Sequence, residues 1–460
     1  MHTYVLRRLA LMIPTLFGIT VIVFAVMAAA PGGISAQSLI QGQNLEPAAK
    51  KAMEDYYNRL YGLDQPAPMQ YLRWLNNISP AGFTFDANNE IEGFSFTKGS
   101  DLGTSFYYGR PVLDLIAERL PITLLLNVLS IPIIYIIAIT VGVRAATERG
   151  KRFDATSGVV MLGLWSVPTM LTGVLMIAFL ASDQYWRWFP AAGINERAAL
   201  GMPFLPHWSA LSDVLILFSL AIAGAVSLVA LSRKGGKTIR ATLFGALGAI
   251  LGALMAEDVA GADISVLHLL LGAGMGGLFV LIGRSDYAPP RTAVMGIVGF
   301  CTGVGLAAAF AQGTFVRGFL LDSLWHLVLP VICLAYTSFA FLSKLTRTAV
   351  LENLLADYAR TARAKGVREA DVLWRHVFRN SLLPLITVSA TLLPGLLAGS
   401  VIVESIFSIE GMGKLAVEAV SFRDRELVLS VTLISGLLTL AGYLVADLCY
   451  AIADPRVSYD

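Results

Sequence analysis

Charged residues are scarce in this sequence. Only 14% of its 460 residues are Asp, Glu, Lys or Arg, and 56% are hydrophobic, whereas about a quarter of an average soluble domain is charged. The hydrophobic residues also stand in uninterrupted blocks of about 20, the length of helix that crosses about 30 Å of hydrocarbon. The composition therefore excludes an ordinary soluble protein and predicts an all-α integral membrane protein.

Cysteine and histidine are too few and too scattered for a metal or redox centre. Cys301, Cys333 and Cys449 stand far apart in apolar runs and indicate neither a disulfide framework nor a zinc cluster. The chain also has no His-Glu-x-x-His metal motif and no Gly-x-Ser-x-Gly nucleophile motif. We expect no metal site and no catalytic residues, and hence a protein that is not an enzyme.

A nucleotide-binding loop is missing too, although one stretch has the residues that end such a loop. Gly236, Lys237 and Thr238 fit the end of the pattern, but a Gly is required five positions before Gly236, where this chain has Leu231. An apolar span precedes the stretch instead of a strand. We therefore expect no ATP site in this chain and no bound cofactor.

Ten apolar segments are candidate transmembrane helices. Lys and Arg concentrate in the cytoplasmic loops of membrane proteins, and an inside N-terminus puts 21 of the 34 Lys and Arg residues on that side. The short outer loops then hold six, and seven fall in the long segment after the first span. We predict a multi-pass protein with both termini cytoplasmic and with spans at 9–30, 120–143, 158–181, 212–231, 238–256, 265–283, 292–311, 322–342, 384–407 and 427–450.

The first span has features of a signal peptide, because it follows Arg7 and Arg8 and ends in small residues. It is longer than the usual signal core of roughly 7–15 residues, so we interpret 1–30 as a retained transmembrane helix. The polar segment 31–119 then predicts a small extracytoplasmic domain. Within it, residues 80–105 are rich in Gly, Asn, Phe and Ser and indicate irregular or short β-structure.

The four spans between 212 and 311 are unusually rich in Gly and Ala. Glycines four positions apart let helix backbones approach closely, and three such pairs occur here: Gly248 with Gly252, Gly272 with Gly276, and Gly299 with Gly303. An even number of spans also leaves the orientation of everything downstream unchanged. We interpret 200–320 as a four-helix membrane insertion into a six-span core, with the later core parts at 120–196 and 322–460.

One strongly charged segment, 357–384, interrupts the apolar sequence. Between Lys344 and Arg379 there are eight Lys or Arg residues and four Asp or Glu residues, and Gly366 separates two helical pieces. We interpret 344–383 as a cytoplasmic loop that docks onto another protein. Small residues there permit close backbone approach, and the neighbouring cations can pair with carboxylates of a partner.

This segment resembles the cytoplasmic loop of ABC-importer permeases of the oligopeptide, dipeptide and nickel family, the binding-protein-dependent transport system inner membrane components. In that family the loop has the form found here, RTARAKG followed by RH, RN and LLP. The resemblance covers 1–196 and 322–460, while 200–320 has no counterpart in the family plan. Further matching stretches are MHTYVLRRLALMIPTLFGITVIVF, YGLDQPAPMQYLRWL, DLGTSFYYGRPVLDLIAERLPITL, WFPAAG, HLVLPVICLAY, GSVIVESIFSIEGMGKL and DLCYAIADPRVSY.

The resemblance implies the permease subunit of an ATP-driven importer for oligopeptides, dipeptides or similar small solutes in the bacterial inner membrane. Its implied partners are a second homologous permease subunit, two cytoplasmic ABC ATPase subunits that bind the ATP, an extracytoplasmic solute-binding protein and membrane lipid, without nucleic acid. The segment 357–379 would form a coupling helix that contacts an ATPase through Thr361, Ala362, Arg363, Ala364, Lys365 and Gly366.

Two positions depart from the general loop pattern of the family. Its Glu is Arg360 in this chain, and the Leu-Pro that often closes the loop is replaced at Arg379 and Asn380. Both departures resemble the habit of this subfamily, and they bear on which neighbouring residues meet the ATPase.

Three alternatives stay open at this point. Glu404 stands in an apolar run, and an intramembrane carboxylate is a functional candidate, so it either lines the translocation path or makes a helix-end or interhelix hydrogen bond. The chain could instead be a membrane-embedded enzyme with its site in the insertion, although the spans contain no cluster of His, Asp or Glu. It could also be a membrane scaffold or regulatory subunit that acts through 212–311.

Overall fold

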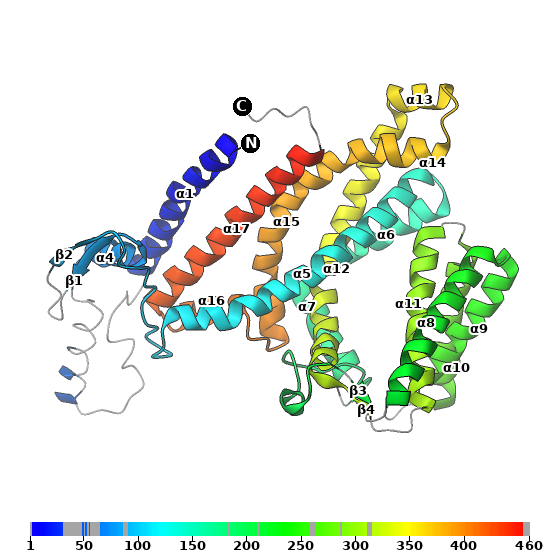
Figure 1. The fold of residues 1–460 in the computed structure, drawn as a ribbon, viewed down its shortest axis with the longest axis horizontal. Coiled ribbons are helices and arrows are strands. Elements are labelled where there is room, and N and C mark those ends of the chain that lie inside the picture. The colour runs from blue at the N-terminus through cyan, green and yellow to red at the C-terminus, as the bar shows by residue number, and fades with distance from the viewer. Residues whose placement is uncertain are drawn as a thin grey trace. The chain divides into compact units, whose positions relative to one another are not determined.

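The structure is a computed structural model that describes residues 2–30, 48–49, 51–52, 55, 65–85, 91–182, 184–205, 207–208, 211–256, 264–285, 288–310 and 315–453. Its described part is helical apart from two small sheets, which confirms the predicted all-α membrane fold (Figure 1). The elements are α1 (His2–Ala29), α4 (Ala67–Ile78), β1 (Gly82–Phe85), β2 (Ile91–Ser95), α5 (Val112–Thr147), α6 (Arg152–Ser166), α7 (Thr169–Met176), the π-helix η1 (Ile177–Ala181), the 3₁₀-helix η2 (Arg197–Gly201), β3 (His207–Trp208), α8 (Leu211–Lys234), α9 (Lys237–Ala256), α10 (Ile264–Arg284), α11 (Ala288–Phe310), β4 (Phe315–Val316), α12 (Gly318–Leu355), α13 (Asp357–Ala364), α14 (Glu369–Asp371), the π-helix η3 (Val372–Val377), α15 (Phe378–Ile406), α16 (Met412–Ser421) and α17 (Arg425–Ala453).

Nine of the ten predicted spans each fall on one helix in the described part of the chain, and several of these helices extend beyond the apolar window. The span expected at 120–143 lies within α5, which has 36 residues, and the span at 322–342 lies within α12, which has 38. Good helix formers flank both windows, so the helices continue into polar sequence. Among the described residues, six helices are long and apolar enough to cross a membrane, or seven if a bent pair counts as one span. The predicted total of ten stays a prediction.

The span predicted at 158–181 is formed by two helical pieces that meet at an angle of 91°. The helix is broken after Ser166, and Val167 takes an extended conformation with φ −83° and ψ 124°. The cause is Pro168, since a proline disfavours helical backbone in the residue before it. The carbonyl that the break leaves without a helical partner is satisfied, because the Tyr336 hydroxyl donates to Val167 O at 2.7 Å.

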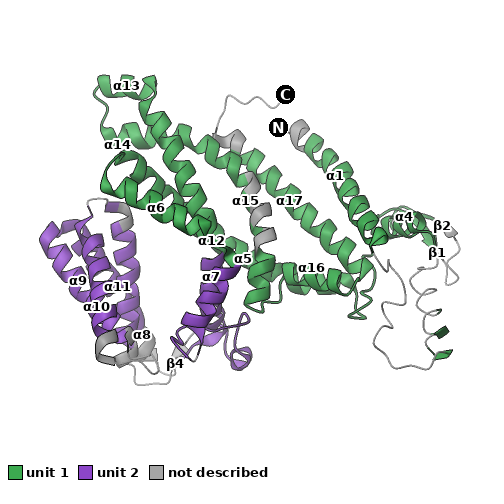
Figure 2. Ribbon diagram, turned by 180° about the vertical axis from the view of Figure 1, so that it is seen from behind, with its two compact units in different colours: residues 1–169, 334–460 green, residues 170–333 purple. Residues whose placement is uncertain are grey.

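The chain forms two compact units, Met1–Thr169 with Leu334–Asp460 and Met170–Cys333 (Figure 2). In the first unit, the long helix α5 is buried at both of its ends. Near its start, Val112 and Leu115 pack with Met412 and Leu415 of α16, and we call this the α5–α16 cluster. Near its end, Val143 and Ala146 belong to a second cluster that is described with the candidate site below.

A polar network reinforces the α5–α16 cluster. The Asp424 carboxylate accepts hydrogen bonds from the Ser105 hydroxyl at 2.5 Å and from the backbone N–H of Leu427 at 3.1 Å, so it caps α17 while holding the loop before α5. Burial raises the pKa of Asp424, and these hydrogen bonds oppose the shift. Close by, the Tyr108 hydroxyl donates to Glu418 at 2.6 Å, and burial together with this bond raises the pKa of Tyr108 to about 12.

Only part of the predicted extracytoplasmic segment 31–119 can be compared with the structure, since most of 31–64 lies outside the described residues. The remainder contains α4 and a hairpin in which β1 pairs with β2 in antiparallel fashion. The hairpin confirms the short β-structure predicted for 80–105. Tyr71 and Trp74 of α4 pack against Phe24 of α1, which attaches this segment to the first helix.

In the second unit, four helices form two closely packed pairs: α8 lies against α11, and α9 lies against α10. The backbones touch at the predicted glycines. A Cβ built on Gly303 would lie 2.2 Å from Leu220 O, and one on Gly252 would lie 2.3 Å from Leu271 O. Both distances are too short for a side chain, so the interpretation of these glycines as close-packing positions is confirmed. Phe244, Phe279 and Met295 fill the space between the pairs.

The chain enters and leaves this four-helix bundle at neighbouring points. Strands β3 and β4 pair in antiparallel fashion, with His207 opposite Val316. The backbone N–H of Phe319 also donates to Pro203 O at 2.9 Å, and that of Leu320 donates to Phe204 O at 3.0 Å. The segment between them therefore begins and ends side by side, as expected of an insertion.

The close packing of α8 on α11 yields a test with a matched control. Replacing Gly303 with Leu puts a side chain where Leu220 O lies, so we expect the free energy of unfolding to fall by about 1–3 kcal/mol. Gly305 lies two residues further along the same helix and has open space around its Cβ position. Thermal unfolding in detergent should show a clear loss for Gly303→Leu and little change for Gly305→Leu; equal losses would contradict the packing.

Candidate coupling surface

The charged segment forms a short helix, α13, that stands between the end of α12 and the start of α14. Ala356 breaks the helical conformation before it, with φ −68° and ψ 151°, and Asp357 in the first turn has the charge that favours a helix N-terminus. At the other end, the N–H of Gly366 donates to Arg363 O at 2.9 Å and that of Val367 donates to Ala362 O at 3.2 Å. This bond pair is the Schellman motif, and Gly366 has the left-handed φ of +77° that it needs.

The inner face of α13 rests on a hydrophobic cluster at the end of α5, which we call the α5–α13 cluster. Ala359 is fully buried there with Val143, Val350 and Val372. Ala362 and Val367 pack against its edge, three and eight residues after Ala359. The small helix is therefore seated on α5, α12 and η3 of the same unit, and its outer face projects from that support.

The structure separates the six predicted contact residues into two groups. Thr361, Ala364, Lys365 and Gly366 are exposed, and a Cβ on Gly366 would meet nothing within 4 Å. Ala362 is half-buried because it faces the α5–α13 cluster, and Arg363 is exposed but already engaged within the chain. The exposed four, together with Tyr358 and Arg360, make the outer face that we call the α13 surface.

Arg363 fastens α13 to its surroundings. Its Nη2 lies 2.8 Å from a carboxylate oxygen of Glu369, and its Nη1 donates to Leu354 O at 3.2 Å. The hydrogen bond to Arg363 lowers the pKa of Glu369, and the same bond raises the pKa of Arg363. Because one guanidinium binds the end of α12 and the start of α14, it fixes the angle at which α13 leaves the bundle.

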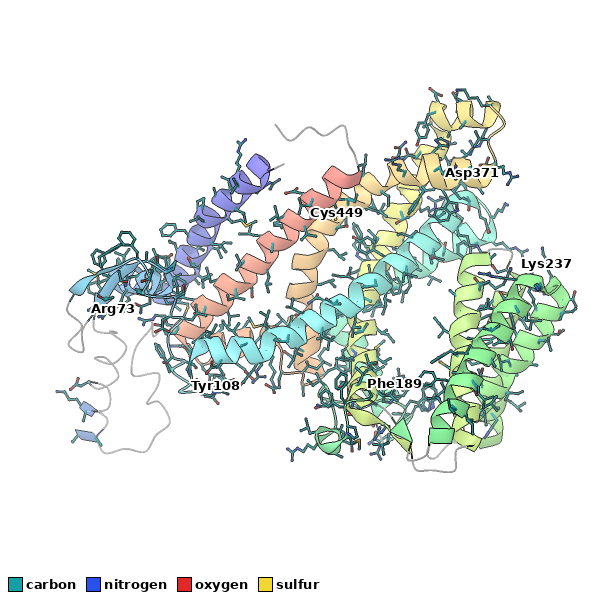
Figure 3. The ribbon with its side chains drawn as sticks, viewed as in Figure 1. Arg73, Tyr108, Phe189, Lys237, Asp371 and Cys449 are labelled. Atoms are coloured by element: carbon teal, nitrogen blue, oxygen red, sulfur yellow. The ribbon has the colours of Figure 1, made fainter. Side chains whose placement is uncertain are left out.

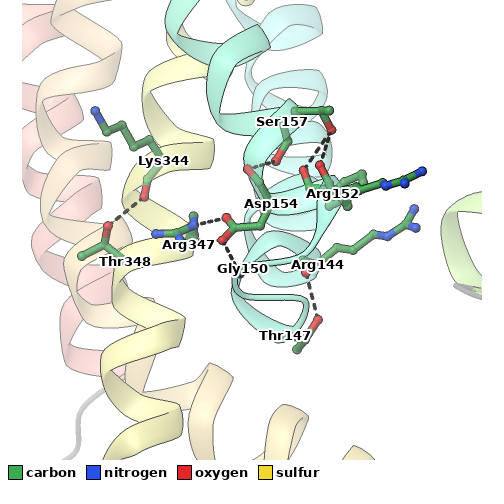
Figure 4. Close-up of polar contacts among 11 residues, drawn as sticks. Arg144, Thr147, Gly150, Arg152, Asp154, Ser157, Lys344, Arg347 and Thr348 are labelled. Carbon is green, nitrogen blue, oxygen red and sulfur yellow. Dashed lines mark hydrogen bonds and ion pairs between the residues drawn. The ribbon is translucent and has the colours of Figure 1, made fainter.

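An ion pair braces the helix that supports α13. Arg347 of α12 donates from Nε to Asp154 Oδ1 at 2.5 Å and from Nη2 to Oδ2 at 2.8 Å, and the N–H of Gly150 donates to the same carboxylate at 2.9 Å (Figure 4). The Asp154 side chain is only 10% exposed. Such a bidentate pair is both strong and geometrically specific, so α6 and α12 are held together just below α13.

Sequence reasoning did not include this brace in the site. Asp154 and Arg347 are 193 residues apart, and no local spacing rule joins residues at that distance. The brace places the turn between α5 and α6 at the same end of the unit as α13. This turn has the exposed cations Arg149, Lys151 and Arg152. The cation excess at each of the two segments was a signal that they lie on one side, but not that they touch.

Glu404 lies in a different part of the unit. Its carboxylate is fully buried, accepts a hydrogen bond from the Thr123 hydroxyl of α5 at 2.7 Å and receives the N–H of Lys414 at 3.0 Å. It thus makes an interhelix hydrogen bond and caps α16 from outside. A role for Glu404 in the translocation path stays a prediction.

The family models and the relatives that match this chain are all membrane proteins of transport systems. Residues 1–127 match the family model described as the N-terminal part of a binding-protein-dependent transport system membrane component, and residues 265–459 match the model of the binding-protein-dependent transport system inner membrane component. The oligopeptide transport system permease protein AppB of Bacillus subtilis is 28% identical over 461 residues, 100% of both chains. The di/tripeptide transport system permease protein DppB of Pseudomonas aeruginosa is 27% identical over 459 residues, 100% of this chain and 99% of its own. The peptidoglycan transport system permease protein YejB of Agrobacterium fabrum is 25% identical over 496 residues, 100% of this chain and 99% of its own.

The brace between α6 and α12 can be tested by comparison with an exposed ion pair. Arg347→Gln removes two charge-assisted hydrogen bonds from Asp154, so we expect a loss of about 1.5–3 kcal/mol in the free energy of unfolding. The control is Arg375→Gln, because the Arg375 and Asp371 side chains are 79% and 42% exposed and lie 3.3 Å apart. It should cost less than about 1 kcal/mol. Denaturant unfolding in detergent that gave equal losses for both variants would refute the brace.

Proposed function

Since this chain belongs to the family of binding-protein-dependent transport system inner membrane components, whose members are transporter permeases and not enzymes, we propose that it conducts oligopeptides, dipeptides or similar small solutes across the membrane. Its six or more membrane-length helices fit a multi-pass inner-membrane permease. The peptide cargo is supported by the names of relatives that match the whole chain, an oligopeptide permease and a di/tripeptide permease.

The family description implies a solute-binding protein and an energy-supplying ATPase as partners. We propose that the complete importer contains a second homologous permease subunit, two cytoplasmic ATPase subunits and one extracytoplasmic binding protein. The excess of Lys and Arg supports a cytoplasmic location for both termini and for the loop 344–383. The ATPases would then bind on the side of the membrane on which α13 is expected.

The single observation that carries the coupling proposal is the α13 surface. It joins small exposed residues, Ala364 and Gly366, to exposed cations such as Arg360 and Lys365. A partner that offers a cleft with carboxylates can seat these small residues and pair with the cations. We therefore assign Thr361–Gly366 to the ATPase contact, with Ala362 and Arg363 acting mainly to hold the helix in place.

Force applied to α13 has a defined route into the membrane helices. The α5–α13 cluster connects it to α5 and α12, Arg363 connects it to the end of α12, and the Asp154–Arg347 pair connects α12 to α6. A nucleotide-dependent movement of the ATPases would shift these helices together. ATP can bias the permease between two states only through contacts that differ between them, and α13 is where we place those contacts.

We further propose that the bundle α8–α11 is an insertion into this permease plan. The adjacent ends at β3 and β4 support the proposal, as does the internal pairing of its helices. The alternative is a scaffold or regulatory subunit that acts on another membrane protein through 212–311. The compactness of the second unit is compatible with an insertion and with a scaffold role, and deletion of the bundle distinguishes the two.

Coupling is tested at Gly366. With the partner subunits co-expressed, the wild-type chain should support uptake of labelled di- and oligopeptides, whereas Gly366→Trp should insert normally and reduce uptake by roughly tenfold or more while ATP hydrolysis continues, as a docking loss of about 1.4 kcal/mol would produce. Nothing lies within 4 Å of a Cβ at that position, but the φ of +77° strains a side chain there. The partner's contact is therefore reported by the difference between Trp and a small side chain at the same position.

The matched control for this experiment is Gly366→Asn. Asn tolerates the left-handed conformation better than other side chains, and it is small, so it should retain most of the uptake. Normal peptide uptake by Gly366→Trp would refute the docking role of α13. Absence of peptide uptake by the wild-type complex, with uptake of another solute, would refute the peptide cargo alone.

The insertion is tested by deletion. Removing residues 206–317 joins Leu205 to Gly318, two points that the flanking hydrogen bonds hold near each other. Because an even number of helices is removed, we expect the shortened chain to insert in the same orientation, assemble and transport. Uptake and co-purification of the partner subunits are the measurements. Loss of assembly by the deleted chain would instead favour the scaffold role.

A further inference from the structure

Six cations gather at one end of the four-helix bundle α8–α11. Contacts between the helices show that they share this end: the Arg291 Nε of α11 donates to the Ser232 hydroxyl of α8 at 3.0 Å, and a Cβ on Gly283 of α10 would lie 2.9 Å from Arg240 O of α9. Lys237 begins α9 at this end (Figure 3). The six are Arg233, Lys234, Lys237, Arg240, Arg284 and Arg291.

Two of these cations are buried close together. Arg240 is 6% exposed and Arg291 is 5% exposed, and both bind Ser232, since Arg240 Nη1 donates to Ser232 O at 3.2 Å. The buried Nε of Arg240 has no hydrogen-bond partner among the described residues. Residues 228–248, 276–285 and 288–295 include no Asp or Glu, and Asp286 of the α10–α11 connection lies outside the described residues. The described residues give Arg240 no carboxylate partner, and a buried charge without an opposite charge is costly, so the surroundings of Arg240 favour an anion.

A groove along α9 and α10 begins at these cations. Its volume is ≈ 670 Å³, and Lys237 and Arg284 lie at its charged end. From there Ala241, Gly245 and Val280 line it with small apolar groups. Lys237 and Gly245 are separated by eight helical residues, about 12 Å along the axis. Thr238 and Thr242 also line it, and the Thr242 hydroxyl donates to Thr238 O of its own helix at 3.1 Å. The groove is therefore cationic at its mouth and mainly apolar along its length.

A second groove, of ≈ 360 Å³, repeats the pattern on α8. Arg233 and Lys234 line one end, and Ala225, Val226 and Val229 line the rest. An inorganic anion would use only the charged end of such grooves. An amphiphile with an anionic head and a hydrocarbon chain matches both parts.

We propose that this end of the bundle binds an anionic phospholipid, with the phosphate at Lys237 and Arg284 and an acyl chain along Ala241, Gly245 and Val280. Basic pockets between transmembrane helices are suited to anionic headgroups, and here the buried Arg240 adds to the positive field. The site gives the insertion a ligand of its own, independent of the transported solute.

The test is lipid retention by the full-length chain. Purified protein is equilibrated with equal amounts of phosphatidylglycerol and phosphatidylcholine that carry the same acyl chains, and the bound lipids are counted by native mass spectrometry. We expect the wild type to retain phosphatidylglycerol preferentially. Lys237→Gln with Arg284→Gln should weaken this binding roughly 30-fold, from the contribution of two cations near an anionic headgroup.

The control removes two exposed cations elsewhere, with Arg149→Gln and Arg152→Gln. It has the same net charge as the groove variant and should retain phosphatidylglycerol as the wild type does. Loss of the preference in this control, or its survival in the groove variant, would overturn the site. Equal retention of both lipids by the wild type would overturn it without any variant.

A second measurement separates the lipid from a free phosphate. Short-chain phosphatidylglycerol should raise the thermal stability of the wild type, and glycerol phosphate or inorganic phosphate at the same concentration should raise it much less. Equal stabilisation by all three would show that the apolar groove is not used and would refute the lipid assignment.

Discussion

A bilayer provides no water to satisfy backbone polar groups, and this constraint governs the whole chain. It explains why the described part is mostly helical and why backbone groups freed where a helix breaks or begins are given partners. At the break near Pro168, the Tyr336 hydroxyl takes over the carbonyl of Val167. At the start of α16, the carboxylate of Glu404 receives a backbone N–H.

The same constraint determined how far the sequence could be interpreted. Long apolar runs have one stable solution in hydrocarbon, so helices could be predicted at the apolar segments, whereas their number as membrane spans stays a prediction. The sequence places Pro168 inside the span predicted at 158–181 but does not show whether it breaks the helix, because prolines also occur inside continuous membrane helices, as Pro121 and Pro132 do in α5. Which prolines break a helix depends on whether a neighbour can satisfy the freed groups, and that neighbour, Tyr336, is distant in sequence.

The coupling segment shows a similar division. Its charge, its glycine and its small residues marked it as a docking element, and the αL conformation at Gly366 accords with that pattern. The inward turn of Ala362 and the engagement of Arg363 were not predictable. Helical spacing rules pair residues three or four apart, whereas Arg363 meets Glu369 across a turn, six residues away. The tertiary brace from Asp154 to Arg347 has no signature in sequence at all.

The hydrogen-bonded pair of strands β3 and β4 has a consequence beyond folding. Because the two ends of the α8–α11 bundle meet, its coding sequence can enter or leave the gene in a single event without rearranging the rest of the transporter. Such a segment can be transferred as one piece, because its helices pack against one another and the cations at its end belong to the same segment. A related permease could acquire the bundle whole, and selection could then act on it separately from the transport pathway.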